Sequence, residues 1–63
     1  MNINEADVKT LAKELEGVGD KKAEAIVLYR EQHGAFKTVD QLKEVKGVGT
    51  AIMEANADSI LLK

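Results

Sequence analysis

The stretch Leu15-Glu16-Gly17-Val18-Gly19 has the same pattern as Val45-Lys46-Gly47-Val48-Gly49, which follows it at an offset of 30 residues. The match continues beyond the glycines, since Glu24-Ala25 aligns with Glu54-Ala55 at the same offset. Each glycine pair stands between segments whose composition favours helices. The repeat predicts two copies of one unit, each a helix, a tight Gly-Val-Gly turn and a second helix.

Helix signals in the first half place two helices around the first glycine pair. Asp7 has the position of an N-cap, and the apolar residues that follow it have helical spacing, which predicts a helix over about 8–16. Asp20 is a second candidate cap, and Gly34 is a helix stop. We therefore expect the second helix over about 21–33, with His33 in its last turn.

Helix signals in the second half place two more helices. The stretch Thr38-Val39-Asp40-Gln41 has the pattern of a capping box, which predicts a third helix that ends near Val45. A fourth helix is expected to begin after Thr50, and the apolar tail 60–62 follows it.

The composition indicates one small helical domain. The chain has 63 residues, no proline, one Phe, one Tyr and no cysteine, which argues against a sheet, a disulfide or a thiolate metal site. We expect an all-α domain over 1–63, a compact SAM-domain-like bundle of four helices. Its two motifs, about 8–33 and about 39–57, are expected to be related by a pseudo-twofold axis. No apolar run is long enough to span a membrane, and residues 1–15 lack the pattern of a secretory signal.

A Gly-Val-Gly turn is suited to binding an anion. Glycines leave the backbone amides uncovered, and the following helix presents unpaired N–H groups and the positive end of its dipole. The valine side chain can turn inward and anchor the hairpin on the core. Two such turns on one face can hold phosphates of opposite strands across a minor groove without reading bases.

The predicted binding residues are those of the two turns and the cations close to them in sequence. Lys21 and Lys22 lie in the first turn of the second predicted helix, where a cation is unfavourable unless an anion arrives. A solvated helix face is the alternative interpretation of each lysine. The complete predicted set is Gly17, Val18, Gly19, Lys21, Lys22, Lys46, Gly47, Val48, Gly49 and Thr50.

No residue pattern indicates catalysis. The glycine pairs complete neither a Walker loop nor a dinucleotide fingerprint. His33 has no second histidine or cysteine partner, and Tyr29 is expected to be partly buried rather than a stacking platform. We therefore expect no enzyme, no metal and no cofactor.

The sequence resembles the helix-hairpin-helix family, and nearly the whole chain is similar to the DNA-binding domain of bacterial competence proteins of the ComEA type. The resemblance implies binding of double-stranded DNA without sequence preference, as in DNA uptake. We also expect a monomer, with no membrane contact from this chain. It implies a periplasmic or extracytoplasmic location if a signal peptide has been removed, and a cytoplasmic one otherwise. The residues that carry it include Asn2-Ile3-Asn4, Leu15, Gly17-Val18-Gly19, Lys22-Ala23, Ala25-Ile26, Tyr29-Arg30-Glu31, Gly34, Phe36-Lys37, Leu42, Val45-Lys46-Gly47-Val48-Gly49 and Asn56.

Several residues depart from the family pattern. Glu16 stands where relatives often have proline, and Asp20 would repel a phosphate unless its carboxylate folds back as a helix cap. Ala51 and Ala57 replace residues that are often basic, so weaker phosphate binding is expected at the second hairpin. The net charge is −2, which predicts a modest affinity for DNA that depends steeply on salt concentration. A protein-interaction adaptor of similar helical fold remains the alternative.

Overall fold

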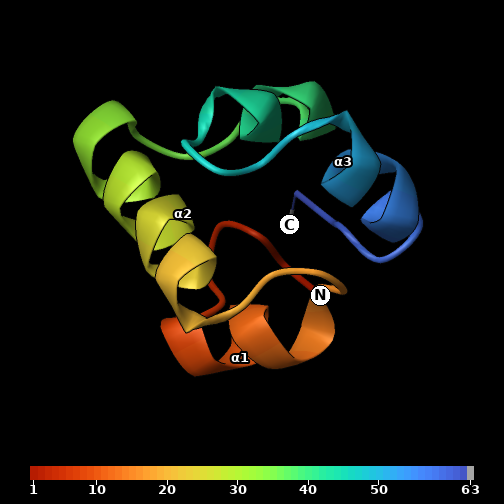
Figure 1. Ribbon diagram of the computed structural model, residues 1–63. Helices are drawn as coiled ribbons and strands as arrows, with labels where there is room; N and C mark the ends of the chain where they lie inside the picture. The colour runs from red at the N-terminus through yellow and green to blue at the C-terminus, as the bar shows by residue number, and fades with distance from the viewer. Residues whose placement is uncertain (63) are drawn as a thin grey trace.

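The computed structural model describes residues 1–62, which form helices in the order expected of two hairpins (Figure 1). The elements are α1 (Val8–Glu14), α2 (Asp20–His33), the 3₁₀ helix η1 (Val39–Glu44) and α3 (Thr50–Asn56). Within this described part there is no strand, and β-type pairing is limited to one bridge between Asn2 and Leu61. The predicted all-α fold of four helices is confirmed.

The start of α1 is set by Asp7, as expected. The Thr10 N–H donates a hydrogen bond of 2.8 Å to the Asp7 carboxylate, which satisfies one of the free amides of the first turn. The helix ends at Glu14 rather than near residue 16, because Leu15 is already extended and leads the chain into the glycine turn.

The predicted cap of α2 is wrong by one residue. Gly19, not Asp20, is the N-cap, and no side chain caps this helix end. The extended backbone of Gly19 (φ −92°, ψ −173°) brings the chain into the helix at Asp20, which becomes the first helical residue. An acidic residue in the first turn suits the helix dipole, but the Asp20 carboxylate makes no hydrogen bond to its own backbone among residues 1–62. The helix ends at Gly34, which has φ +87°.

The third helix is a 3₁₀ helix, and its predicted capping box does not form. The Gln41 N–H donates to the Thr38 carbonyl at 3.2 Å, so this amide is not available to the Thr38 hydroxyl. The Gln41 side chain instead accepts the Lys37 N–H at 2.9 Å. A period of three residues per turn places Val39, Leu42 and Val45 on one side, toward the core.

The core lies between the two motifs and takes side chains from every helix. Burial of this apolar surface is the main stabilising contribution in a chain without disulfides. The buried apolar residues are Ile3, Leu11, Leu15, Val18, Ala23, Ile26, Phe36, Leu42, Val45, Val48, Met53 and Ile60.

The two ends of the described chain pair with each other and close the domain. The Ile3 N–H donates to the Leu61 carbonyl at 2.8 Å, and the Leu61 N–H donates to the Met1 carbonyl at 2.9 Å. The Asn4 side chain adds bonds to the carbonyls of Phe36 and Leu62. The apolar tail is therefore part of the domain. No helix in residues 1–62 combines the length and the apolar composition that a bilayer crossing requires.

Candidate nucleic-acid interface

The two glycine turns have the same backbone geometry. Gly17 and Gly47 have φ of +81° and +92°, in the left-handed region that favours glycine. Gly19 and Gly49 are both extended, with ψ of −173° in each case, and each is the N-cap of the following helix. The sequence repeat is thus also a repeat of backbone conformation.

The valines between the glycines anchor the turns on the core, as expected. The Val18 and Val48 side chains are 5% and 6% exposed. Their amides are also used internally, since Val18 N–H donates to the Leu15 carbonyl at 3.3 Å and Val48 N–H to the Val45 carbonyl at 3.0 Å. Neither valine has an amide available for a ligand.

The amides that follow the valines remain open. No acceptor among residues 1–62 bonds the N–H groups of residues 19–21 or 49–51. Gly19 and Gly49 are exposed, and a Cβ atom on either would meet nothing within 4 Å. Each turn therefore offers backbone donors without an internal acceptor beside an exposed glycine, which suits an anion.

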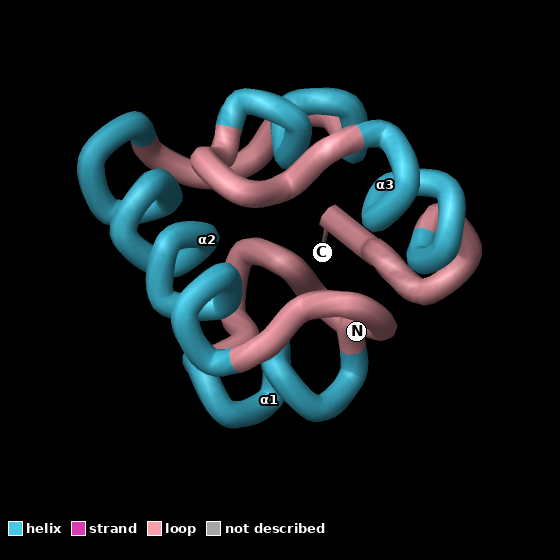
Figure 2. The backbone as a smooth tube through the Cα atoms, viewed as in Figure 1, coloured by secondary structure: helices cyan, strands magenta, loops and turns pink. Residues whose placement is uncertain are grey.

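The two turns pack reciprocally against each other's motif. A Cβ atom on Gly17 would lie 3.8 Å from Cγ1 of Ile52, and one on Gly47 would lie 3.4 Å from Cγ of Lys22. Lys22 and Ile52 occupy equivalent positions in the repeat, so the packing follows the pseudo-twofold relation. Figures 1 and 2 show both loops, 15–19 and 45–49, crossing the face turned to the viewer.

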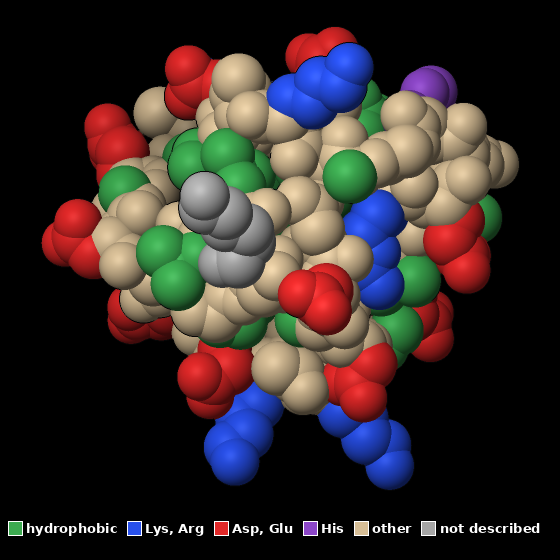
Figure 3. Space-filling view, turned by 180° about the vertical axis from the view of Figure 1, so that it is seen from behind, with side chains coloured by type: hydrophobic (Ala, Val, Ile, Leu, Met, Phe, Trp, Pro, Cys, Tyr) green, Lys and Arg blue, Asp and Glu red, His purple; other side chains and the backbone are tan. Residues whose placement is uncertain are grey.

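The charged side chains are unevenly placed around the turns. Lys21 and Lys46 are exposed, Lys22 is half-buried along Gly47, and Thr50 is exposed at the start of α3. In the described part of the chain the one ion pair is Lys43 with Asp40, at 3.9 Å. Figure 3 shows many acidic side chains on the opposite face. Exposed carboxylates also lie beside the first turn, at Glu16 and Asp20.

Asn56 joins the two motifs, a role that sequence reasoning missed. Its side chain is 2% exposed, accepts the Glu16 N–H at 2.7 Å and donates to the carbonyls of Glu16 and Ile52 at 2.9 Å. The end of α3 is thereby bonded to the first turn. One signal was available in the sequence. Asn56 follows Ile52 by four positions and Met53 by three, which places a polar side chain on the same helix face as these apolar residues.

Other candidate residues have structural roles. Tyr29 is half-buried and stacks on Phe36, with ring centroids 5.3 Å apart, so its ring is no open platform for a base. His33 lies exposed in the last turn of α2, as expected. Arg30 donates to the carbonyls of Ile3 and Ala6, both at 2.8 Å, so its guanidinium holds the N-terminal segment.

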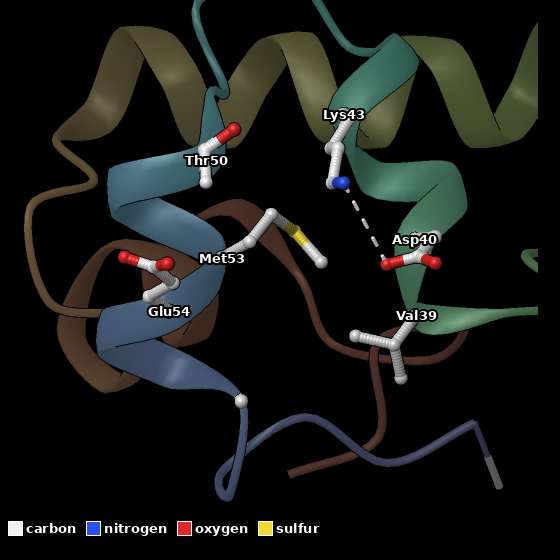
Figure 4. A pocket seen from close by; sticks show the side chains of 7 residues that line it. Val39, Asp40, Lys43, Thr50, Met53 and Glu54 are labelled. Atoms are coloured by element: carbon white, nitrogen blue, oxygen red, sulfur yellow. Dashed lines mark ion pairs between the residues drawn. The ribbon is translucent and has the colours of Figure 1, made fainter.

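A small hollow lies between η1 and α3 (Figure 4). Its volume is about 270 Å³, slightly below the range usual for small-molecule pockets. Val39 and Met53 line it with apolar surface, and its Asp40 and Lys43 side chains pair with each other. Within residues 1–62, His, Asp and Glu side chains form no group of three that could hold a metal ion.

The domain consists of two reciprocally packed units, each made of two helices joined by a glycine turn. This arrangement defines a tandem helical-hairpin domain. A family model described as helix-hairpin-helix motif matches residues 1–61. The chain therefore belongs to the helix-hairpin-helix family, which confirms the resemblance seen in the sequence.

Three relatives place the domain in longer proteins. The chain is 52% identical over 61 residues to an uncharacterized protein of Haemophilus influenzae, covering 97% of the chain and 54% of that protein. It is 41% identical over 63 residues to ComE operon protein 1 of Bacillus subtilis, covering 100% of the chain and 30% of that protein. It is 40% identical over 63 residues to kinesin-like protein KIF22 of Xenopus tropicalis, covering 94% of the chain and 10% of that protein. The chain thus spans about half, or less, of the length of these relatives.

Proposed function

We propose that this domain binds double-stranded DNA without sequence preference, through phosphate contacts made by its two glycine turns. The observation that carries the proposal is the pair of matching turns on one face, each with open amides at residues 19–21 or 49–51 and no side chain at its N-cap glycine. Membership of the helix-hairpin-helix family and the similarity to ComE operon protein 1 support a nucleic-acid ligand and a role in DNA uptake.

The proposed contacts involve the backbone rather than the bases. Phosphate oxygens accept hydrogen bonds from the open amides, and Lys21, Lys22 and Lys46 supply positive charge. The pseudo-twofold relation presents equivalent donors to the two strands of a duplex, as across a minor groove. No side chain of the turns reaches base edges in this arrangement, and the domain carries out no catalysis.

The number of cations near the turns sets the expected salt dependence of binding. Two to four phosphate contacts correspond to a log–log slope of binding against salt of roughly −2 to −4. Since the net charge is −2, measurable affinity is expected mainly at low ionic strength.

The proposal is tested most directly by substitutions at the two N-cap glycines that should lower DNA affinity without lowering the stability of the fold. Gly19→Asp and Gly49→Asp fit the extended backbone and open space of these positions, and an aspartate caps a helix well. The new carboxylate would occupy the anion position itself. We expect the stability of each variant to be unchanged or raised by a few tenths of a kcal/mol. Duplex affinity is expected to fall roughly tenfold or more, as for loss of a charge-assisted contact.

The measurement is fluorescence anisotropy with a random duplex at about 50 mM and about 200 mM salt, a range over which phosphate contacts weaken strongly. Ala35→Asp adds the same charge at an exposed position of the linker and is the matched control. Equal losses in all three variants would mean that only net charge matters. If the unmodified domain shows no duplex binding at the lower salt, the proposal is wrong and a protein-interaction adaptor is favoured.

A further inference from the structure

The two turns differ in local charge, although their backbones match. At equivalent positions of the repeat, Glu16 aligns with Lys46 and Asp20 aligns with Thr50. The first turn is thus flanked by two carboxylates, and Lys21 offsets one of them. The second turn has a cation in place of the first carboxylate and a neutral hydroxyl in place of the second.

In the structure, a further cation lies beside the second turn. Lys22 follows the first glycine pair in sequence, yet its side chain lies along Gly47. A Cβ atom on Gly47 would be 3.4 Å from its Cγ, 3.8 Å from its Cδ and 3.6 Å from its Cε. The equivalent residue of the other motif, Ile52, lies against Gly17 and is apolar. The reciprocal packing therefore places a charged side chain at the second turn and an apolar side chain at the first.

We propose that the second turn is the leading phosphate site of the domain and that Lys22, from the first motif, completes it. This inference rests on the proposed function. It reverses the ranking expected from sequence, in which Lys22 was assigned to the first turn and the second was the weaker. The site consists of the turn 45–49 together with Lys22 and Lys46, two cations with no ion-pair partner in the described residues.

Packing makes Lys22 well suited to this role. Its stem is half-buried on Gly47, so the side chain loses less rotamer freedom on binding than a fully exposed lysine would. Glycine is favoured at position 47, because its φ of +92° is a backbone conformation that other residues rarely adopt. At the first turn, Asn56 bonds the backbone of Glu16, the acidic residue that precedes Gly17.

The experiment compares Lys22→Met with Lys21→Met. Methionine keeps an unbranched apolar stem on Gly47 and removes only the charge, and Lys21 is the matched neighbour with the same net-charge change. We expect Lys22→Met to weaken binding to a random duplex roughly fivefold to tenfold and to reduce the salt slope by about one. Lys21→Met is expected to weaken binding by about twofold or less.

A site-resolved readout locates the effect. In ¹H–¹⁵N spectra of the unmodified domain titrated with the duplex, the amides of Gly47, Gly49 and Thr50 should shift more than those of Gly17, Gly19 and Asp20. In Lys22→Met the shifts at the second turn should shrink while those at the first persist. Duplex binding with larger shifts at the first turn, or with a larger loss in Lys21→Met, overturns this inference and leaves the proposed function intact. Absence of binding by the unmodified domain overturns both.

Discussion

Replacing Asn56 with alanine tests whether one buried amide holds the two motifs together. The Asn56 side chain is 2% exposed and makes three hydrogen bonds, two to the backbone of Glu16 and one to the Ile52 carbonyl. Asn56→Ala removes all three and leaves the Glu16 N–H and carbonyl without their partners.

The expected loss is large for a domain of this size. At about 1 kcal/mol for each net hydrogen bond, Asn56→Ala should lower the free energy of unfolding by about 3 kcal/mol. A domain of 63 residues has a free energy of unfolding of roughly 3 to 9 kcal/mol. The expected loss therefore equals between a third and all of that free energy.

Urea unfolding followed by circular dichroism measures this loss. The midpoint should fall with an unchanged slope, since the surface exposed on unfolding stays the same. Gln32→Ala, at an exposed position of α2, is the control and should change stability by less than about 0.5 kcal/mol. A loss below about 1 kcal/mol in Asn56→Ala would refute the reasoning, because it would mean that water replaces the amide at no cost.

Two further predictions concern the turns and the first helix. Gly17→Ala and Gly47→Ala place a Cβ atom on a backbone with positive φ and should each cost about 1 to 2 kcal/mol. Gly19→Ala, on extended backbone, should cost less than either, and a urea titration of all three that gave equal losses would contradict this ranking. The Thr10 N–H, which bonds the Asp7 carboxylate, lowers the pKa of Asp7 below its ordinary value of 3.8. Its stabilising effect is therefore present above that value and is lost as pH falls through the lower folded-state pKa. Asp7→Asn keeps a cap that does not titrate, so its stability measured between about pH 6 and about pH 2.5 should fall less than that of the unmodified domain; an equal fall would show that other carboxylates account for acid sensitivity.

Local signals in the chain were sufficient for much of this architecture. The repeat at an offset of 30 residues indicated two hairpins, and the apolar spacing with glycine stops located four helices within about two residues. Asp7 was identified as a cap because capping depends on an amide only three residues away. The two valines were expected to point inward because the turn leaves no other apolar anchor. Each of these features depends on residues close in sequence.

Local signals failed where neighbouring backbone bonds competed. The Thr38 capping box was a reasonable expectation, but the 3₁₀ geometry gives the Gln41 amide to a backbone carbonyl instead. The Asp20 cap failed because the glycine before it already has the extended conformation that a cap requires. In both cases the residue type was compatible with two local structures, and the backbone adopted the other one.

The sequence by itself determined that there would be two glycine turns, where the helices around them would lie and which cations would be near a turn along the chain. Only the tertiary structure decided which turn Lys22 lies against, because its side chain crosses to Gly47 when the two motifs pack together. The same docking buries Asn56 against the first turn and pairs the N-terminal segment with residue 61. Contacts between residues 25 to 60 positions apart depend on how whole helices pack, and neither helix propensity nor the spacing of apolar residues contains that information.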